Sequence, residues 1–387
     1  MIVRANGWVA AVVVVAACGR FGFSGRTDAT EVSDVSDDGA NVEACNGIDD
    51  DSDALVDEGC PCVPFEVTLD GRSVRGGDGA VWTGAEVVIV SADAGLDAIR
   101  VRDGVMLPAV DLGGAQFSPN SVAWTGTAVA VVWQDMTNLA VRTYTPETGA
   151  LGPTTPIGPA QVAARIAWAN DRLIVAWVSA GAVFIRELDR GGAPLGPARM
   201  VTTTTQTNLD AIIATSRSYV LGLSSPASGT YAIAFIDRQT GVPTMVAPDL
   251  GAGRSIRLRE GPAGVAATLG SPDGAFKLQL FAPDGTPLDA GVPVPAGPGG
   301  PFMGDALLAS SHGIHVVGFT PGAVHDVMTV SFDPTTLSWG PVTVLTNFSS
   351  GAIGSLPSSF GSEGRIGLAE FYSSVGPLKN LVKHVCL

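Results

Sequence analysis

The sequence lacks any uninterrupted apolar run of eighteen residues, although 46% of its 387 residues are hydrophobic. A transmembrane helix needs about 20 consecutive apolar residues, so a membrane span is excluded. The sequence also lacks a basic stripe, since 22 Lys and Arg residues face 37 Asp and Glu residues and the net charge is −15. Proteins that bind nucleic acids present clustered basic residues to the phosphates, so nucleic acid is excluded as a partner.

Recognisable catalytic signatures are missing too. None of the four histidines lies in an H-E-x-x-H context, and residues 71–75 and 222–226 each lack the last glycine of a G-x-S-x-G elbow. His312 and His315 are interpreted as strand-edge or loop histidines. Single aspartates follow several apolar runs at positions that turns favour, namely Asp189, Asp237, Asp284 and Asp333. The sequence therefore names no catalytic residue.

What the sequence does contain is a recurring pattern, seen most clearly in residues 118–162. A short strand ends in Ala123-Trp124, a Thr-Gly turn follows, and an almost wholly apolar run leads to a polar break and a third run. The apolar second run recurs at residues 87–90, 129–132, 173–176, 219–223, 264–269, 314–319 and 365–371. A period in the forties with about four strands per unit is typical of β-propeller blades, so the prediction is an all-β, seven-bladed propeller, with six or eight blades as alternatives.

The apolar runs explain why the units should pack face to face. A half-buried strand alternates apolar and polar residues, whereas these second strands are continuously apolar and must be covered on both sides. Trp82, Trp124 and Trp168 recur at the same place in successive units and are predicted to lie in the core between blades. The cluster of Arg254, Arg257 and Arg259 is interpreted as a surface cluster, with a place along the central channel as the alternative.

Residues 65–70 form a strand left over before the first unit, while the seventh unit ends one strand short. We predict that this N-terminal strand pairs with the last strand and closes the ring.

The N-terminus resembles an export signal. One positive charge, Arg4, precedes an apolar run over residues 8–17, and the sequence Val15-Ala16-Ala17-Cys18 follows. This string resembles the lipobox of bacterial lipoproteins, which implies acylation of Cys18 and anchoring to the outer membrane or cell surface. An ordinary signal peptide cut after Ala17 is the alternative.

Acidic residues concentrate just after this segment. Between Asp28 and Glu58 there are 12 acidic residues and no basic one, and from Cys60 onward 25 acidic residues face 19 basic residues. The predicted organisation is a signal peptide (1–17), a flexible acidic linker (18–43), an acidic metal-binding motif (44–62) and a propeller (63–387).

Alternating carboxylates define the acidic motif. Asp49, Asp51 and Asp53 can converge on one hard cation, with the Leu55 carbonyl, Asp57 and nearby Glu58 as further oxygen ligands. Oxygen donors favour Ca²⁺ over copper. The loop is not an EF-hand, because Ala54 replaces the turn glycine and Cys60 the bidentate glutamate; a solvated acidic linker without specific binding is the alternative.

The string CNGIDDDSDALVDEGC at residues 45–60 resembles the MopE-type metal-binding motif of bacterial surface proteins. The resemblance implies a metal site and covers only these 16 residues. Ser52 replaces the family's internal cysteine, and Ala54 replaces its glycine.

The cysteines other than Cys18 can form disulfides in an oxidising compartment, with three connectivities. We favour Cys45 with Cys60, closing the acidic loop, and Cys62 with Cys386, since ring closure brings those two segments together.

Two functions from different classes fit these patterns. The first is a lipid-anchored surface protein whose propeller is a non-enzymatic binding or scaffold module for a protein or glycan. The second is a secreted propeller hydrolase or lyase that acts on a polysaccharide or ester.

Overall fold

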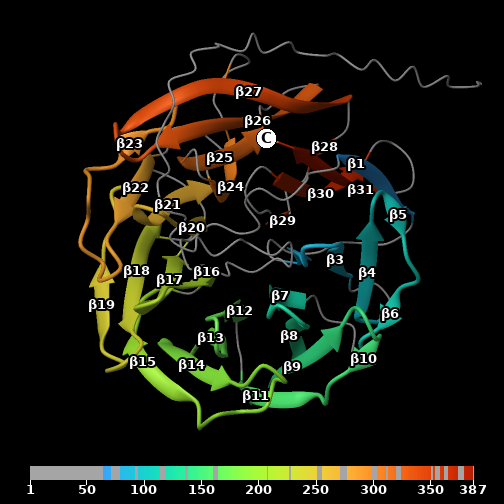
Figure 1. Cartoon of the computed structure of the whole chain (residues 1–387). Coiled ribbons are helices and arrows are strands. Elements are labelled where there is room, and N and C mark those ends of the chain that lie inside the picture. The colour runs from blue at the N-terminus through green and yellow to red at the C-terminus, as the bar shows by residue number, and fades with distance from the viewer. Residues whose placement is uncertain are drawn as a thin grey trace, which may run out of the picture. The chain divides into compact units, whose positions relative to one another are not determined.

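The computed structural model describes residues 64–386, with gaps at 71–78, 92–94, 114–118, 136–137, 160–163, 207, 226–227, 251–254, 271–276, 298–302, 311–312, 320–323, 350–351, 354–357, 361–364 and 374–378. All regular structure in this part is β-strand, arranged in seven antiparallel sheets (Figure 1). Among the residues described there is no helix long and apolar enough to cross a membrane. The predicted signal peptide, linker and acidic motif lie outside the described residues.

We number the sheets 1 to 7 in chain order. Sheet 1 contains β2 (Ala80–Trp82), β3 (Val87–Ser91), β4 (Asp97–Arg102), β5 (Val105–Met106) and β6 (Val110–Asp111). Sheet 2 contains β7 (Pro119–Trp124), β8 (Val129–Asp135), β9 (Asn138–Thr145), β10 (Ala150–Leu151) and β11 (Thr155–Pro159). Sheet 3 contains β12 (Ala164–Trp168), β13 (Leu173–Ser179), β14 (Ala182–Leu188) and β15 (Arg199–Thr203).

Sheets 4 to 7 follow the same plan. Sheet 4 contains β16 (Asn208–Ala214), β17 (Ser218–Ser225), β18 (Thr230–Asp237) and β19 (Pro243–Val246), and sheet 5 contains β20 (Ser255–Gly261), β21 (Gly264–Gly270), β22 (Lys277–Phe281) and β23 (Val292–Pro293). Sheet 6 contains β24 (Met303–Ser310), β25 (Gly313–Phe319), β26 (Val324–Asp333) and β27 (Ser338–Ser349). Sheet 7 contains β28 (Ala352–Ile353), β29 (Ser358–Phe360), β30 (Arg365–Ser373) and β31 (Lys379–Cys386), together with β1 (Phe65–Asp70).

The first strands of the sheets form a closed cycle. Each contacts the first strand of the next sheet, in the order β2, β7, β12, β16, β20, β24 and β29, and β29 contacts β2 again. Figure 1 shows these strands around a common axis with the later strands of each sheet further out. The all-β propeller prediction is therefore confirmed, and each of the seven apolar runs identified in the sequence lies within the second strand of a sheet.

The second strands are buried on both faces because a sheet lies on each side. In β3, Val88 and Val90 pack into the core between sheets 1 and 2, while Val87 and Ile89 pack into the core between sheets 1 and 7. The same alternation continues in β8 and β13. Burying a large apolar side chain contributes about 1.5–3 kcal/mol, so these interfaces are the main source of stability.

The recurrent tryptophans also lie at these interfaces. Trp124 is buried in the core between sheets 1 and 2. Trp82 and Trp168 are half-buried and pack against the neighbouring cores. The predicted location between blades is confirmed for all three.

A polar side chain of the third strand links neighbouring sheets at one repeat position. Arg186 of β14 donates to the Ile157 carbonyl in sheet 2 (2.7 Å) and to the Gly196 carbonyl in its own sheet (3.2 Å). The equivalent side chain in sheet 2, Arg142, donates to the Leu112 and Gly152 carbonyls. In sheet 5 the Gln279 side chain accepts the Asp249 N–H and donates to the Asp289 carbonyl. These bonds satisfy buried backbone groups and fix each sheet against the one before it.

Strand β1 closes the ring. It pairs with β31 in an antiparallel register that joins Phe65 to His384 and Asp70 to Lys379, so the leftover strand occupies the outer edge of sheet 7 as predicted. Glu66 and Thr68 are exposed, whereas Leu69 is fully buried against sheet 1. Cys62 lies outside the described residues, so its pairing with Cys386 stays a prediction.

Replacing Leu69 with alanine should destabilise the ring where it closes. The change leaves a cavity between sheets 7 and 1 and should cost about 2–5 kcal/mol of unfolding free energy, measured by urea denaturation. The exposed neighbour provides the control, since Thr68→Ala should change the unfolding free energy by less than about 0.5 kcal/mol. Equal effects of the two changes would show that β1 contributes no buried face.

Candidate binding surface

Hairpins between the first and second strands share one turn, which positions the charged residues beside it. In sheets 1, 2 and 4 a threonine opens the turn, and its hydroxyl accepts the backbone N–H three residues on, as from Glu86 to Thr83 (3.2 Å). In sheet 3 the same place is Ala169, and Asn170 adopts a φ of 62°. The Ala169 carbonyl accepts the Asp171 N–H of its own turn (2.8 Å) and a bond from Arg238 of sheet 4 (3.2 Å), so the next sheet also holds this turn.

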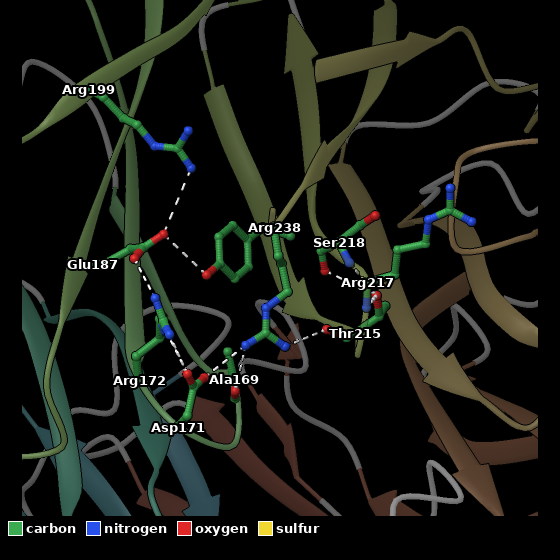
Figure 2. Close-up of polar contacts among 10 residues, drawn as sticks. Ala169, Asp171, Arg172, Glu187, Arg199, Thr215, Arg217, Ser218 and Arg238 are labelled. Carbon is green, nitrogen blue, oxygen red and sulfur yellow. Dashed lines mark hydrogen bonds and ion pairs between the residues drawn. The ribbon is translucent and has the colours of Figure 1, made fainter. Parts of the chain in front are cut away.

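Six side chains then form a continuous polar network between sheets 3 and 4, which we name the hairpin cluster. Its members are Asp171, Arg172, Glu187, Arg199, Tyr219 and Arg238. Figure 2 shows the charged members with their contacts, from Arg199 through Glu187, Arg172 and Asp171 to Arg238.

Arg172 is the centre of the cluster within sheet 3. It donates to Asp171 (2.5 Å) and to Glu187 (2.8 Å). Sheet 4 supplies the cross-links, because Arg238 reaches Asp171 (2.8 Å) and the Tyr219 hydroxyl reaches Glu187 (3.3 Å). The cluster therefore ties the turn segments of two sheets into one unit.

Arg199 of β15 completes the cluster at the outer side. It lies 3.8 Å from Glu187, and its guanidinium packs against Gly241 of sheet 4. A side chain at Gly241 would occupy the space that this guanidinium takes, and its φ of 73° also favours glycine.

The cluster shifts the pKa values of its members in the directions that its contacts require. Hydrogen bonding to Arg172 lowers the pKa of Asp171, and hydrogen bonds to Asp171 and Glu187 raise the pKa of Arg172. Burial, with Glu187 nearby, raises the pKa of Tyr219. Asp171 and Arg172 are therefore ionised near neutral pH, and Tyr219 keeps its proton as a donor.

Sheet 1 carries the same ion pair with the charges reversed. Glu86 and Arg172 both immediately precede a second strand, and Arg100 and Glu187 both pair with the second residue of that strand. Arg100 donates to Glu86 at 2.7 Å, and Arg102 adds a bond at 3.0 Å. The Glu86 side chain is only 1% exposed, whereas that of Glu187 is 24% exposed.

The guanidinium groups of two further arginines on hairpins of sheets 3 and 4 have no hydrogen bond or ion pair among the described residues. The Arg190 guanidinium lies over the Trp168 ring, 5.1 Å from its centroid. Arg217 is exposed beside Ser218, whose hydroxyl donates to the Pro283 carbonyl of sheet 5 (2.7 Å). Figure 2 shows the Arg217 side chain directed away from the hairpin cluster. Both guanidiniums keep their donors for another molecule.

The hairpin aspartates have the turn role that the sequence predicts. Asp189 accepts the backbone N–H of Ala193 (2.8 Å), and Asp237 accepts that of Thr240 (2.7 Å). Asp284 and Asp333 accept corresponding bonds from Thr286 and Thr335. Such bonds are the largest cause of the lowered pKa of Asp237 and Asp284.

A separate set of charged residues lies along the axis of the ring. Arg257 and Arg259 belong to β20, a first strand near the axis, and are half-buried, which favours the channel alternative over a surface cluster for them. Arg254 lies outside the described residues. On the preceding first strands, Arg165 donates to the Asp210 carbonyl (2.9 Å), and the Asp210 carboxylate accepts the Ile256 N–H (2.9 Å).

Other predicted site residues fall largely outside the described part of the chain. This holds for Cys18, for the metal ligands Asp49, Asp51, Asp53, Leu55, Asp57 and Glu58, and for Cys45, Cys60 and Cys62. Cys386 ends β31 opposite Arg365. His315 lies inside β25 and is 8% exposed, so it is a buried strand residue. Within the described ranges no group of three His, Cys, Asp or Glu could hold a metal ion.

The hairpin cluster was missed in the sequence because its members come from different units. A signal was present: with the units aligned on their second strands, Glu86 and Arg100 coincide with Arg172 and Glu187. Both positions carry a charged residue in each unit, and the two signs are opposite within a unit and reversed between units. This pattern indicates that the two positions are in contact. Arg238, by contrast, follows a turn aspartate and gives no sign of its partner in the preceding sheet.

No family model and no curated protein matches the chain. Among solved structures, it is similar to the β-propeller domain of Cps50 (Swd1) from Myceliophteria thermophila. The TM-score is 0.54 at 12% identity, over 83% of this chain and 98% of that chain. The likeness shows a β-propeller fold. At this identity it shows nothing about a ligand or an activity.

The reversed ion pairs predict a difference that depends on burial. Glu86→Gln leaves Arg100 facing a neutral amide in a buried site and should cost about 3 kcal/mol of unfolding free energy. Glu187→Gln removes the same charge from a more exposed site and should cost less than about 1 kcal/mol. Urea denaturation of both variants at neutral pH measures the two values, and a larger loss for Glu187→Gln would contradict the assignment.

Proposed function

We propose that the protein is an exported, lipid-anchored cell-surface β-propeller that works as a non-enzymatic binding or scaffold module. The observation that carries this proposal is the surface of sheets 3 and 4. The hairpin cluster fixes the turns of two sheets relative to each other, and Arg190 and Arg217 extend from those turns with unused donors. A rigid surface with fixed polar groups favours recognition of a protein or glycan partner over chemistry.

The proposed anchor is Cys18, by resemblance to the lipobox. The described part of the propeller begins with β1, on the outer edge of sheet 7.

Removing the acylated cysteine should release the protein from membranes. We expect the full chain, expressed in a bacterium that processes lipoproteins, to fractionate with membranes and a Cys18→Ala variant to remain soluble. A Ser24→Ala variant in the linker provides the control and should fractionate as the unaltered chain does. Membrane association of Cys18→Ala would contradict the anchor without affecting the binding role of the propeller.

We further propose that the acidic motif binds Ca²⁺ through Asp49, Asp51, Asp53, the Leu55 carbonyl, Asp57 and Glu58, with copper as the less favoured metal. Disulfides from Cys45 to Cys60 and from Cys62 to Cys386 would hold the motif next to the propeller. The β1–β31 register supports the second bond, because Phe65 pairs with His384. Cys62 precedes the first of these residues by three positions and Cys386 follows the second by two.

Calorimetric titration of the mature protein tests this site. We expect saturable Ca²⁺ binding that is lost in an Asp51→Ala, Asp53→Ala variant, since two of the converging carboxylates are removed. An Asp37→Ala, Asp38→Ala variant removes the same charge from the linker and should bind as before. Cu²⁺ binding without Ca²⁺ binding would reassign the metal, and no heat with either ion would leave the segment as a tether.

The alternative, a secreted hydrolase or lyase acting on a polysaccharide or ester, has one observation in its favour. Asp210 is a buried carboxyl group on a first strand, and burial raises its pKa, as is typical of catalytic acids. Its carboxylate, however, already accepts the Ile256 N–H of the next sheet. We therefore favour the binding role.

A further inference from the structure

The outer strands of most sheets are short or protected against pairing with another chain. β5, β6, β10 and β23 have two residues each, and no other outer strand except β27 has more than six. Those with four to six residues contain a proline or an ionisable residue, namely Pro156 and Pro159 in β11, Arg199 in β15, Pro243 in β19 and Glu66 in β1. Such residues are the usual protection of a sheet edge.

Strand β27 departs from this rule. It has twelve residues and forms the outer edge of sheet 6. Gly340 and Pro341 protect its beginning, but residues 342–349 (VTVLTNFS) contain no proline, glycine or ionisable residue. Among the described residues nothing pairs with the outer side of this strand, so its backbone donors and acceptors on that side face outward.

The geometry of β27 leaves two stretches suited to pairing. Its register with β26 shifts between Val330 and Phe332, where Pro341 lies, and again between Val327 and Met328, where Leu345 is the extra residue. Residues 342–344 and 346–349 are regularly paired with β26 on their inner side. Val344 is 47% exposed, so an apolar side chain is available beside the first stretch.

We propose that the outer edge of β27 is a strand-addition site that binds an extended segment of a partner protein through main-chain hydrogen bonds. Strand addition takes its affinity from the backbone ladder and its selectivity from alternate side chains. An edge rich in valine and threonine fits a segment of β-branched residues.

The net charge of the protein favours a different protein over a second copy of this chain as the occupant of the β27 edge. From Cys60 onward 25 acidic residues face 19 basic residues, so the propeller of a second copy would also carry a negative net charge, and such self-repulsion favours the monomer. The uncharged edge of an acidic protein is instead suited to a neutral or basic segment. This site is separate from the hairpin cluster, and its test is independent of the proposed function.

Fluorescence anisotropy with a defined peptide tests the site on the full mature chain. The probe is a labelled eight-residue peptide of alternating threonine and valine with a lysine at each end. We expect saturable binding, and we expect a peptide that is N-methylated at every residue not to bind, because neither of its edges can donate to the ladder. Equal binding of the two peptides would overturn the proposal.

Two lysine variants locate the binding. Val344 and Leu337 have the same exposure, 47%, but Leu337 lies in the turn before β27 and not on its edge. Val344→Lys should weaken peptide binding about tenfold or more, since lysine blocks an edge and repels the basic probe. Leu337→Lys adds the same charge to the same sheet and should bind nearly as the unaltered chain does, as should Val344→Thr.

Matching melting temperatures of the two lysine variants show that the fold is intact. Equal weakening by both lysines would assign the effect to charge alone and overturn the site. Light scattering provides a further readout: a dimer that Val344→Lys dissociates would identify a second copy as the occupant and overturn the proposed partner.

Discussion

The fold depends on one constraint, which is that each second strand is apolar on both of its faces. A single sheet can cover neither face by itself, so every sheet needs a neighbour on both sides. In a linear stack the first and last sheets would each expose one such face. The described strands meet the constraint by forming a cycle, in which Val87 and Ile89 of the first sheet pack towards the last.

The hydrogen bonds between neighbouring sheets are a consequence of the same close packing. Once two sheets are pressed together, the turn segments at their ends carry backbone groups that have lost water and need partners. Arg142, Arg186 and Gln279 satisfy the outer segments, and Arg238 donates to the Ala169 carbonyl. Charged and polar side chains at these interfaces therefore fix the position of each sheet relative to the next. The energy of each bond is small, but together the bonds restrict how one sheet can slide on the next.

Repeat analysis predicted the fold well because its signal is local. The seven apolar runs, the turn aspartates and the leftover strand at residues 65–70 are each visible within a few consecutive residues. The candidate surface was not predicted, because its contacts join residues of different units, as Arg238 joins Asp171 across 67 positions. The place of Arg257 and Arg259 on a first strand was not predicted for a related reason. Their spacing shows alternation along a strand, but not whether that strand is the innermost one of its sheet.

The pairing of β1 with β31 also has a consequence for how the chain folds. The two strands are separated by more than three hundred positions, and a contact this distant carries a large loop-closure cost. Of the described strands, β1 is synthesised first and β31 last. Until β31 is complete, the ring cannot close, and the first sheet has an apolar face without its final neighbour.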